Sequence, residues 1–240
     1  MELIPIQAIA APLSQPYIPF RSGLIMEKLF AYELSRYTTV IVGNGETPQG
    51  EIPTRFLQRA EVIVCCDGAL DKLLKISVKP DVVIGDCDSI SEERRQQFKD
   101  IIIEDKDEEC NDLQKALKYC KRENYKHIAV LGASGLRDDH QLANLSILNM
   151  YAEQMDLIMV SNYGLFSFIS EDTTFSSTPR QEVSVFSFDG QAEFTFSGLQ
   201  YPVHQRRFAQ LWEGSLNKAL GERFTVKISN GRGLVFREFC

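Results

Sequence analysis

Two aspartates separated by a single residue follow an apolar run in the first half of the chain. They are Asp86 and Asp88, in the sequence GDCDS, directly after the β-branched run DVVI. If the chain curls into a loop here, both carboxylates can reach one cation, and hard oxygen ligands of this kind suit Mg²⁺. Asp and Ser are also common in turns and helix caps. The motif by itself therefore leaves two interpretations open, a metal site and a structural turn.

A second acidic segment, DKDEECND, occupies positions 105–112 between a short apolar run and a helix-like sequence. Acidic side chains at a helix N-terminus are favoured by the helix dipole by about 0.3–1 kcal/mol each. This segment places five carboxylates within eight residues, however, and they repel one another unless a cation lies nearby. We expect Asp112 to be a third metal ligand and Lys115 to lie beside it on one helix face.

A glycine-containing segment, GASGLRDDH, occupies positions 132–140 after another apolar run. Small residues let the backbone approach a phosphate, and the N-terminus of the following helix attracts anions. Arg137 can bind phosphate oxygens through its forked guanidinium group, and Asp139 can orient a hydroxyl or complete a metal shell. Glycine-rich loops are also ordinary connections between strands and helices. This segment is therefore informative only together with the other polar segments.

A fourth polar segment, CDGA at 66–69, also follows an apolar run. The carboxyl ends of parallel strands meet at one edge of a sheet, where ligands bind. We therefore expect the four segments to lie together. The candidate catalytic residues are Asp86, Asp88, Asp112, Arg137 and Asp139, of which the three at 86, 88 and 112 are the candidate metal ligands.

The elements that position these segments alternate along the chain from position 38. Strand-like runs are followed by helix-like sequences such as NDLQKALKYCKRE and DHQLANLSILNMYAE. Such alternation predicts βαβ units, a parallel sheet and right-handed crossovers. The helix after the GDCDS loop is expected to start at Ser91, whose side chain can cap it.

The pattern changes after about Met155. The runs LIMVSNYGLFSFI, EVSVFSFDGQAEFTFSGLQY and RFTVKISNGRGLVFREF each alternate around a Gly-containing turn and predict three β-hairpins. The fold class is therefore α/β, with an N-terminal parallel-sheet Rossmann-like domain followed by a C-terminal antiparallel β-sandwich domain. The predicted boundaries are an N-terminal extension at 1–25, a catalytic nucleotide-binding domain at 26–155 and a β-sandwich domain at 156–240.

Composition limits the classes of function. The net charge of −7 argues against nucleic-acid binding, which normally needs a basic surface. The six cysteines have no zinc-site spacing, and we expect a reducing cytoplasmic compartment. No apolar stretch is long enough for a membrane helix, so no membrane partner is expected. Residues 1–25 do not resemble a signal peptide, and they are either a natural, disordered extension or precede a true start at Met26.

Four motifs in this order resemble those of the thiamine pyrophosphokinase family. They are CDGA (66–69), GDCDS (85–89), DEECND (107–112) and GLRDDH (135–140). The segments VSVFSF and SGLQYPV resemble family motifs of the β part, so the similarity covers roughly residues 38–240. The resemblance implies that pyrophosphate is transferred from ATP to the hydroxyl of thiamine, which gives thiamine diphosphate and AMP. It also implies Mg²⁺ as cofactor and a homodimer with active sites between the subunits.

The family pattern assigns roles to individual residues. It makes Asp86, Asp88 and Asp112 the Mg²⁺ ligands, whereas Asp67, Arg137 and Asp139 contact substrate or triphosphate. Further candidate binding residues are Gly68, Ser89, Glu109, Asn111, Lys115, Gly132, Gly135, His140, Ser215, Asn217 and Phe236.

Three positions and one motif depart from the family pattern. Glu109 stands where the family usually has Asp, Asn111 where it has Thr, and Leu136 where it has a glycine of the phosphate loop. The family's Ser-Asn motif is matched only loosely, by Ser215 and Asn217. Alternatives are therefore a pyrophosphokinase for another heterocyclic alcohol, such as a pterin, a non-catalytic nucleotide sensor, and an enzyme that hydrolyses a nucleotide without an acceptor.

Overall fold

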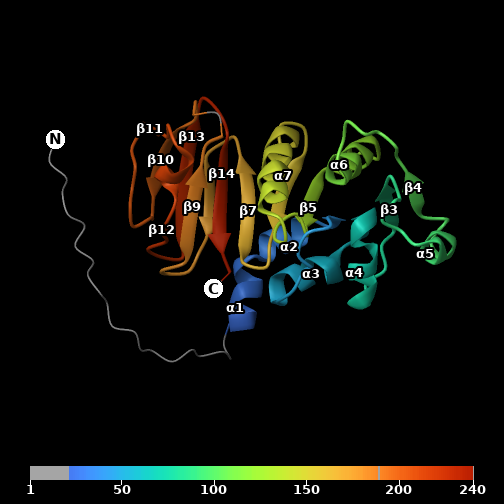
Figure 1. The fold of residues 1–240 in the computed structure, drawn as a ribbon. Helices are drawn as coiled ribbons and strands as arrows, with labels where there is room; N and C mark the ends of the chain where they lie inside the picture. Colours follow the sequence, from blue (N-terminus) through green and yellow to red (C-terminus); the bar gives the residue numbers. More distant parts are fainter. Residues whose placement is uncertain (1–21, 189, 240) are drawn as a thin grey trace, which may run out of the picture.

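The computed structural model describes residues 22–188 and 190–239, which form two β-sheets with helices packed on one of them (Figure 1). Most of the predicted N-terminal extension, residues 1–21, lies outside the described residues. Helix α1 begins at Ser22 and crosses the boundary predicted at position 26. No helix of the described chain is long and apolar enough to span a bilayer.

The first part of the chain alternates between strands and helices, as its sequence predicts. Short β-branched runs form the strands because their side chains are buried on both sheet faces. The elements are α1 (Ser22–Leu29), α2 (Ala31–Arg36), β1 (Thr39–Val42), α3 (Glu51–Arg59), β2 (Val62–Cys66), the short 3₁₀ helix η1 (Asp67–Ala69), α4 (Leu70–Lys75), β3 (Val82–Gly85), α5 (Glu92–Gln97), β4 (Ile102–Glu104), α6 (Asp112–Arg122), β5 (His127–Leu131), α7 (Asp138–Tyr151) and β6 (Asp156–Val160).

Strands β1 to β6 are parallel and lie in the order β4-β3-β2-β1-β5-β6. Alternate residues of β1 enter different cores. Val40 and Val42 pack in the core that α1 to α4 cover, whereas Ile41 packs in the core that α6 and α7 cover. Strands β2, β3 and β4 follow one another on one side of β1, whereas β5 and β6 lie on its other side, so the strand order reverses between β1 and β5. Open α/β sheets bind ligands at such a point. The prediction of a Rossmann-like parallel sheet is confirmed.

Two helices begin at the residues that their caps predict. The Ser91 hydroxyl accepts a hydrogen bond from the Arg94 N–H at the start of α5. Asn111 caps α6 and forms a reciprocal capping box with Gln114. These bonds satisfy backbone donors that have no partner within the helix. They also fix the place where the acidic loop ends and Asp112 begins the helix.

The second part of the chain is a β-sandwich that shares a sheet with the first part. Strand β7 pairs antiparallel with β6, so the parallel sheet continues through β7, β14, β9 and β12 to ten strands (Figure 1). A four-stranded sheet, β11-β10-β13-β8, packs against this extension. The elements are β7 (Gly164–Ile169), β8 (Thr173–Ser176), β9 (Glu182–Phe186), β10 (Glu193–Ser197), β11 (Arg206–Arg207), η2 (Leu211–Gly214), β12 (Asn217–Lys218), β13 (Arg223–Ser229) and β14 (Gly233–Glu238).

Only the first of the three predicted hairpins forms. Strands β6 and β7 pair across the turn at 161–163, but β9 and β10 lie in different sheets, and so do β13 and β14. The prediction of those two hairpins was wrong because the alternating apolar residues face each other across the sandwich. Val183 and Val185 from one sheet pack in the same core as Phe194 and Phe196 from the other. A hairpin in one plane would leave one of these apolar faces uncovered.

A buried ion pair joins the start of the described chain to its end. Arg237 on β14 donates a short hydrogen bond to Glu33 on α2, and only 1% of the Arg237 side chain is exposed. The guanidinium group lies between two aromatic rings, 4.9 Å from the Phe30 centroid and 4.8 Å from the Phe175 centroid. If either member of this buried ion pair is removed, the remaining charge is left buried without a partner, and the fold is destabilised.

We expect Arg237→Met to lower the free energy of unfolding by about 3–5 kcal/mol, because it leaves the Glu33 carboxylate buried without its partner. Urea denaturation followed by circular dichroism measures the change. The double variant Glu33→Gln/Arg237→Met should lose less than the sum of the two single variants. Arg207→Met, at a largely exposed arginine, is the control and should change stability by less than about 1 kcal/mol. Additive losses in the double variant would refute the pairing.

Candidate active site

The polar loops that the sequence singles out follow β2, β3, β4 and β5 and meet at the carboxyl edge of the parallel sheet. Asp67, Asp86 and Asp88 each offer a carboxylate oxygen, and these oxygens lie within 4.8 Å of one another. The sequence placed Asp86 and Asp88 in a metal site and Asp67 in a substrate contact. The structure brings all three together.

The loop after β3 curls back so that the carboxylates of its two aspartates lie close together, as a shared metal site would require. Cys87 lies between them with a φ of 66°, in the left-handed region that residues with a Cβ avoid. The Asp86 carboxylate accepts the Asp88 N–H at 3.1 Å, and Ser89 donates its hydroxyl to Asp88 at 3.0 Å. The segment is therefore a tight turn and a carboxylate cluster at once. Such backbone strain is typical of functional sites.

Asp67 is the buried member of the cluster, with 2% of its surface exposed. Its carboxylate accepts backbone N–H groups from Gly68 at 2.5 Å and from Cys87 at 2.9 Å. Burial, followed by the negative charge of Asp112, raises the pKa of Asp67 to about 6. The Asp88 N–H, in contrast, lowers the pKa of the exposed Asp86. A cation at this place would relieve the repulsion that raises the pKa of Asp67.

Lys115 is the buried cation of this edge, and 4% of its side chain is exposed. Its ammonium group lies 3.4 Å from the Asp112 carboxylate, one turn earlier on α6. Burial lowers the pKa of Lys115, but the carboxylates of Asp112, Asp86 and Asp105 outweigh burial and raise it. The predicted pairing of Lys115 with Asp112 is therefore present, and Lys115 stays charged.

Other residues of the acidic segment have structural partners. The Asn111 side chain caps α6, and Lys118 pairs with Asp107 at 2.9 Å. Glu109 is exposed, and its N–H donates to the Asp107 carboxylate. Part of this segment therefore has a structural role, in helix capping and in an ion pair. This agrees with the general preference for acidic residues at helix N-termini. The roles of Glu109 and Asn111 in binding remain predictions.

The loops after β1 and β5 are in backbone contact at the point where the sheet order reverses. Gly45 donates its N–H to the Gly132 carbonyl at 2.6 Å, and Glu46 donates to Ser134 at 2.8 Å. A Cβ on Gly132 would lie 2.5 Å from the Gly43 oxygen, so only glycine permits this approach. Sequence reasoning missed the β1 loop, although its sequence GNGE follows a strand like the other polar segments.

Leu136, which stands where the family pattern has a glycine, adopts a left-handed backbone conformation. Its φ is 64°, its side chain is exposed, and the Arg137 N–H donates to the Gly135 carbonyl at 2.8 Å across it. This γ-turn preserves the glycine-like path of the phosphate loop at some cost in strain. Beyond it, Arg137 forms a bidentate pair with Asp139 at 3.1 and 2.6 Å, and His140 is exposed.

The structure does not bring Ser215 and Asn217 to the carboxylate cluster of the same chain. Strand β12 lies eight strand positions from β3, roughly 38 Å at about 4.8 Å per position. The Asn217 side chain bonds both backbone groups of Tyr201, and Ser215 donates its hydroxyl to the Trp212 carbonyl. Neither can contact a substrate bound at Asp86 in its own subunit.

Phe236 lies closer to the cluster, in a hollow of about 450 Å³ beside the β1 and β5 loops. Its ring packs on Phe166 with centroids 4.7 Å apart. Tyr163, Gly135 and Glu46 contribute to the same lining. The hollow opens at the carboxyl edge of the sheet and thus adjoins the candidate phosphate loop.

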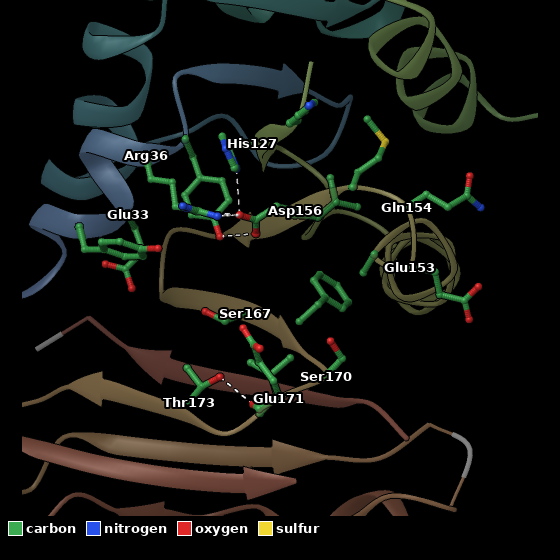
Figure 2. Close-up of a pocket in the computed structure, with 18 of the residues that line it drawn as sticks. Glu33, Arg36, His127, Glu153, Gln154, Asp156, Ser167, Ser170, Glu171 and Thr173 are labelled. Atoms are coloured by element: carbon green, nitrogen blue, oxygen red, sulfur yellow. Dashed lines mark hydrogen bonds and ion pairs between the residues drawn. The ribbon is translucent and has the colours of Figure 1, made fainter. Parts of the chain in front are cut away.

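A larger hollow of about 680 Å³ lies at the opposite, amino edge of the sheet (Figure 2). Its central carboxylate, Asp156, accepts hydrogen bonds from Tyr37 at 2.6 Å and from Arg36 at 2.7 Å, and His127 Nδ1 lies 2.9 Å away. Burial alone would raise the pKa of Asp156, but these hydrogen bonds outweigh it and lower the pKa. The Asp156 carboxylate therefore already has hydrogen-bond partners within the protein. Open α/β sheets bind their ligands at the carboxyl edge and not at this amino edge.

Comparison with known proteins identifies the family. A family model described as the thiamin pyrophosphokinase catalytic domain matches residues 54–159, and one described as the thiamin pyrophosphokinase substrate-binding domain matches residues 164–236. The two models cover most of the chain and follow each other in order. This chain belongs to the thiamine pyrophosphokinase family.

Relatives support the same assignment of this thiamine pyrophosphokinase family member. Thiamine pyrophosphokinase 1 of Oryza sativa subsp. japonica is 27% identical over 57% of this chain, and the match spans only 60% of that relative's length. Thiamine pyrophosphokinase 1 of Arabidopsis thaliana is 25% identical over 80% of this chain and 83% of its own length. The crystal structure of thiamine pyrophosphokinase from Bacillus subtilis has the same fold, with a TM-score of 0.72, 19% identity, and coverage of 83% of this chain and 98% of that one.

We expect the stability of the metal-free protein to depend on the titration of Asp67. Its pKa is about 6 when folded and near 3.9 when unfolded, so between these values the folded state binds more protons. The unfolding free energy of the wild type, relative to Asp67→Asn, should therefore fall by about 2–3 kcal/mol between pH 4 and pH 8. Urea denaturation in chelator at several pH values measures this difference.

The exposed Asp100 provides the control, because Asp100→Asn retains Asp67 and should keep the pH dependence of the wild type. Added Mg²⁺ at pH 8 should restore stability to the wild type but not to Asp67→Asn. An equal pH dependence in both variants would contradict the assignment of a raised pKa to Asp67.

Proposed function

We propose that this chain is a thiamine pyrophosphokinase that transfers a pyrophosphoryl group from ATP to the hydroxyl of thiamine and releases AMP. The observation that carries the proposal is the convergence of Asp67, Asp86 and Asp88 at the carboxyl edge of a sheet whose chain matches both domains of this family. We also propose a cytoplasmic location, which fits the five free cysteines of the described chain.

The cluster fits Mg²⁺ by the chemistry of its donors. Three carboxylates lie within 4.8 Å of one another, and burial, followed by the negative charge of Asp112, raises the pKa of Asp67. Hard oxygen ligands of this type suit Mg²⁺ better than softer metals. Asp67, Asp86 and Asp88 would hold the ion. Asp112, the third ligand that the sequence predicted, faces Asp67 from α6, and its role as a ligand remains a prediction. When bound, Mg²⁺ neutralises charge on the phosphate oxygens.

The remaining groups position the phosphates and the acceptor. The backbone of the loop from Gly132 to Gly135 and the N-terminus of α7 favour an anion, and Arg137 lies at that helix start. Arg137 can exchange its exposed bond with Asp139 for phosphate oxygens. While Arg137 is bonded to Asp139 it lowers the pKa of that carboxyl, and the exchange leaves Asp139 able to accept a hydrogen bond from the incoming hydroxyl. Positioning and charge neutralisation therefore supply most of the catalysis.

A homodimer would complete the site. Ser215 and Asn217 lie far from Asp86 in one chain, yet the resemblance assigns them to substrate binding. The segment that carries them exposes four large apolar side chains, Leu211, Trp212, Leu216 and Leu220. Exposed apolar residues concentrated in one segment are typical of an interface. A second copy that covers this segment would bring it to the cluster of the first.

We expect purified protein to release AMP from Mg²⁺-ATP only when thiamine is present, with one thiamine diphosphate formed per AMP. Asp88→Asn should lower kcat at least about a hundredfold, because it removes a negatively charged ligand of the proposed metal ion. The unfolding transition should stay unchanged. Asp100→Asn is the matched control and should keep full activity. Product analysis by chromatography measures both nucleotides and thiamine diphosphate.

Other outcomes of this assay identify the alternatives. AMP formation that requires a pterin alcohol instead of thiamine would indicate a different acceptor. AMP formation without any alcohol would indicate a hydrolase, and no AMP under any condition would favour a nucleotide sensor. Full activity in Asp88→Asn would overturn the metal assignment.

The dimer can be tested separately by its mass in solution. Light scattering should give twice the mass of one chain, and the double variant Trp212→Glu/Leu216→Glu should give one chain mass and lose most activity. Tyr32→Ser, at an exposed aromatic residue of α2, is the control and should remain dimeric. A monomeric wild type with full activity would refute the proposed composite site.

A further inference from the structure

The hollow at the carboxyl edge combines aromatic rings with one carboxylate, and we call it the aromatic hollow. It is lined by Glu46, Tyr163, Phe166 and Phe236, with Gly135 at its floor. The two phenylalanine rings pack at 4.7 Å, and 68% of the Tyr163 surface is exposed. Neither the family motifs nor the resemblance assigns any role to Glu46.

The backbone fixes Glu46 in this place. Its N–H donates to the Ser134 carbonyl at 2.8 Å, and Lys72 donates to the carbonyls of Asn44 and Gly45 at 2.7 and 2.8 Å just before it. A Cβ on Gly135 would lie 2.8 Å from the Glu46 Cβ, so the side chain rests directly on the glycine backbone. Glu46 is thus held by two loops rather than free in solvent.

The carboxylate of Glu46 has no cation of its own. Among the described residues, no lysine, arginine or histidine forms an ion pair with it. The arginine closest along the facing loop, Arg137, pairs with Asp139 instead. A partly buried carboxylate beside aromatic faces attracts a positively charged aromatic ring, both by charge and by cation–π contact.

We propose that Glu46 is a specificity-determining residue that selects an acceptor with a permanently cationic aromatic ring. This inference rests on the proposed function, in which the acceptor carries a thiazolium ring and the donor carries a neutral adenine and a polyanion. The aromatic hollow takes the thiazolium ring, with its charge beside the Glu46 carboxylate.

The place of the hollow suits this assignment. The loop that carries Glu46 also touches the metal loop, since a Cβ on Gly68 would lie 2.3 Å from the Asn44 amide nitrogen. Gly68 follows Asp67 directly. A ring in the aromatic hollow therefore lies next to the loop of the proposed metal-binding carboxylates, where the hydroxyl of the acceptor must react.

The test compares thiamine with its neutral isostere, in which carbon replaces the charged ring nitrogen. Wild-type protein should prefer thiamine in kcat/KM, and Glu46→Gln should reduce this preference about tenfold. The loss should appear as a higher KM for thiamine, with the KM for ATP changed less than about twofold. Glu51→Gln, at an exposed glutamate at the start of α3, is the matched control and should keep the wild-type preference.

Calorimetry with the same two compounds separates this inference from the proposed function. If the wild type forms no AMP with thiamine, the proposed function fails, but tighter binding of thiamine than of the isostere that depends on Glu46 would still support the inference. Equal discrimination by wild type and Glu46→Gln would overturn the inference whether or not the enzyme is active. A change confined to the KM for ATP would assign the hollow to the nucleotide and overturn it too.

Discussion

The crowding of carboxylates at one edge of the sheet is the constraint on which the rest of the site depends. Asp67 is buried by the strands around it and faces Asp112, while Asp86 and Asp88 approach from the next loop. Such an arrangement is unfavourable in the metal-free protein, and the raised pKa of Asp67 records the cost. Lys115 offsets part of the repulsion from within the fold. The turn at Cys87 and the capping of α6 hold the carboxylates in place despite their mutual repulsion.

Close approach of two loops is the second requirement. The backbones after β1 and β5 touch only because glycines stand at 43, 45 and 132, and this contact carries Glu46 to the hollow beside Phe236. The same contact holds the loop in which Leu136 stands where the family pattern has a glycine. The neighbouring loops fix the path, and the leucine side chain points to solvent, so the substitution costs strain but no packing.

The sequence predicted the parallel sheet, the helix cap at Ser91 and the gathering of the polar loops because these follow from local patterns. Alternating β-branched runs and helical faces have fixed periods, and the ends of parallel strands share one edge. Strand partners in the β part were harder to predict. The turns at 189–190 and 230–231 have hairpin sequences, but the burial of Phe194 and Phe196 against the other sheet decided the pairing.

Other features left little trace in the sequence. The burial of Asp67 within the carboxylate cluster and the pairing of Glu33 with Arg237 depend on contacts between distant segments. No local pattern marks a glutamate and an arginine some two hundred positions apart as partners. The β1 loop could have been found, because GNGE follows a strand end just as the other polar loops do.

The continuous sheet has a mechanical consequence. Many enzymes that transfer phosphoryl groups close two lobes about a hinge and so exclude water from the reacting atoms. Here β6 and β7 are hydrogen-bonded neighbours in one ten-stranded sheet, and no free linker separates the two halves. The halves cannot swing relative to each other without breaking that ladder. In the proposed reaction, protection of the transferred group from water would therefore fall to the loops at the carboxyl edge and, in the proposed dimer, to the surface that the second subunit places over them.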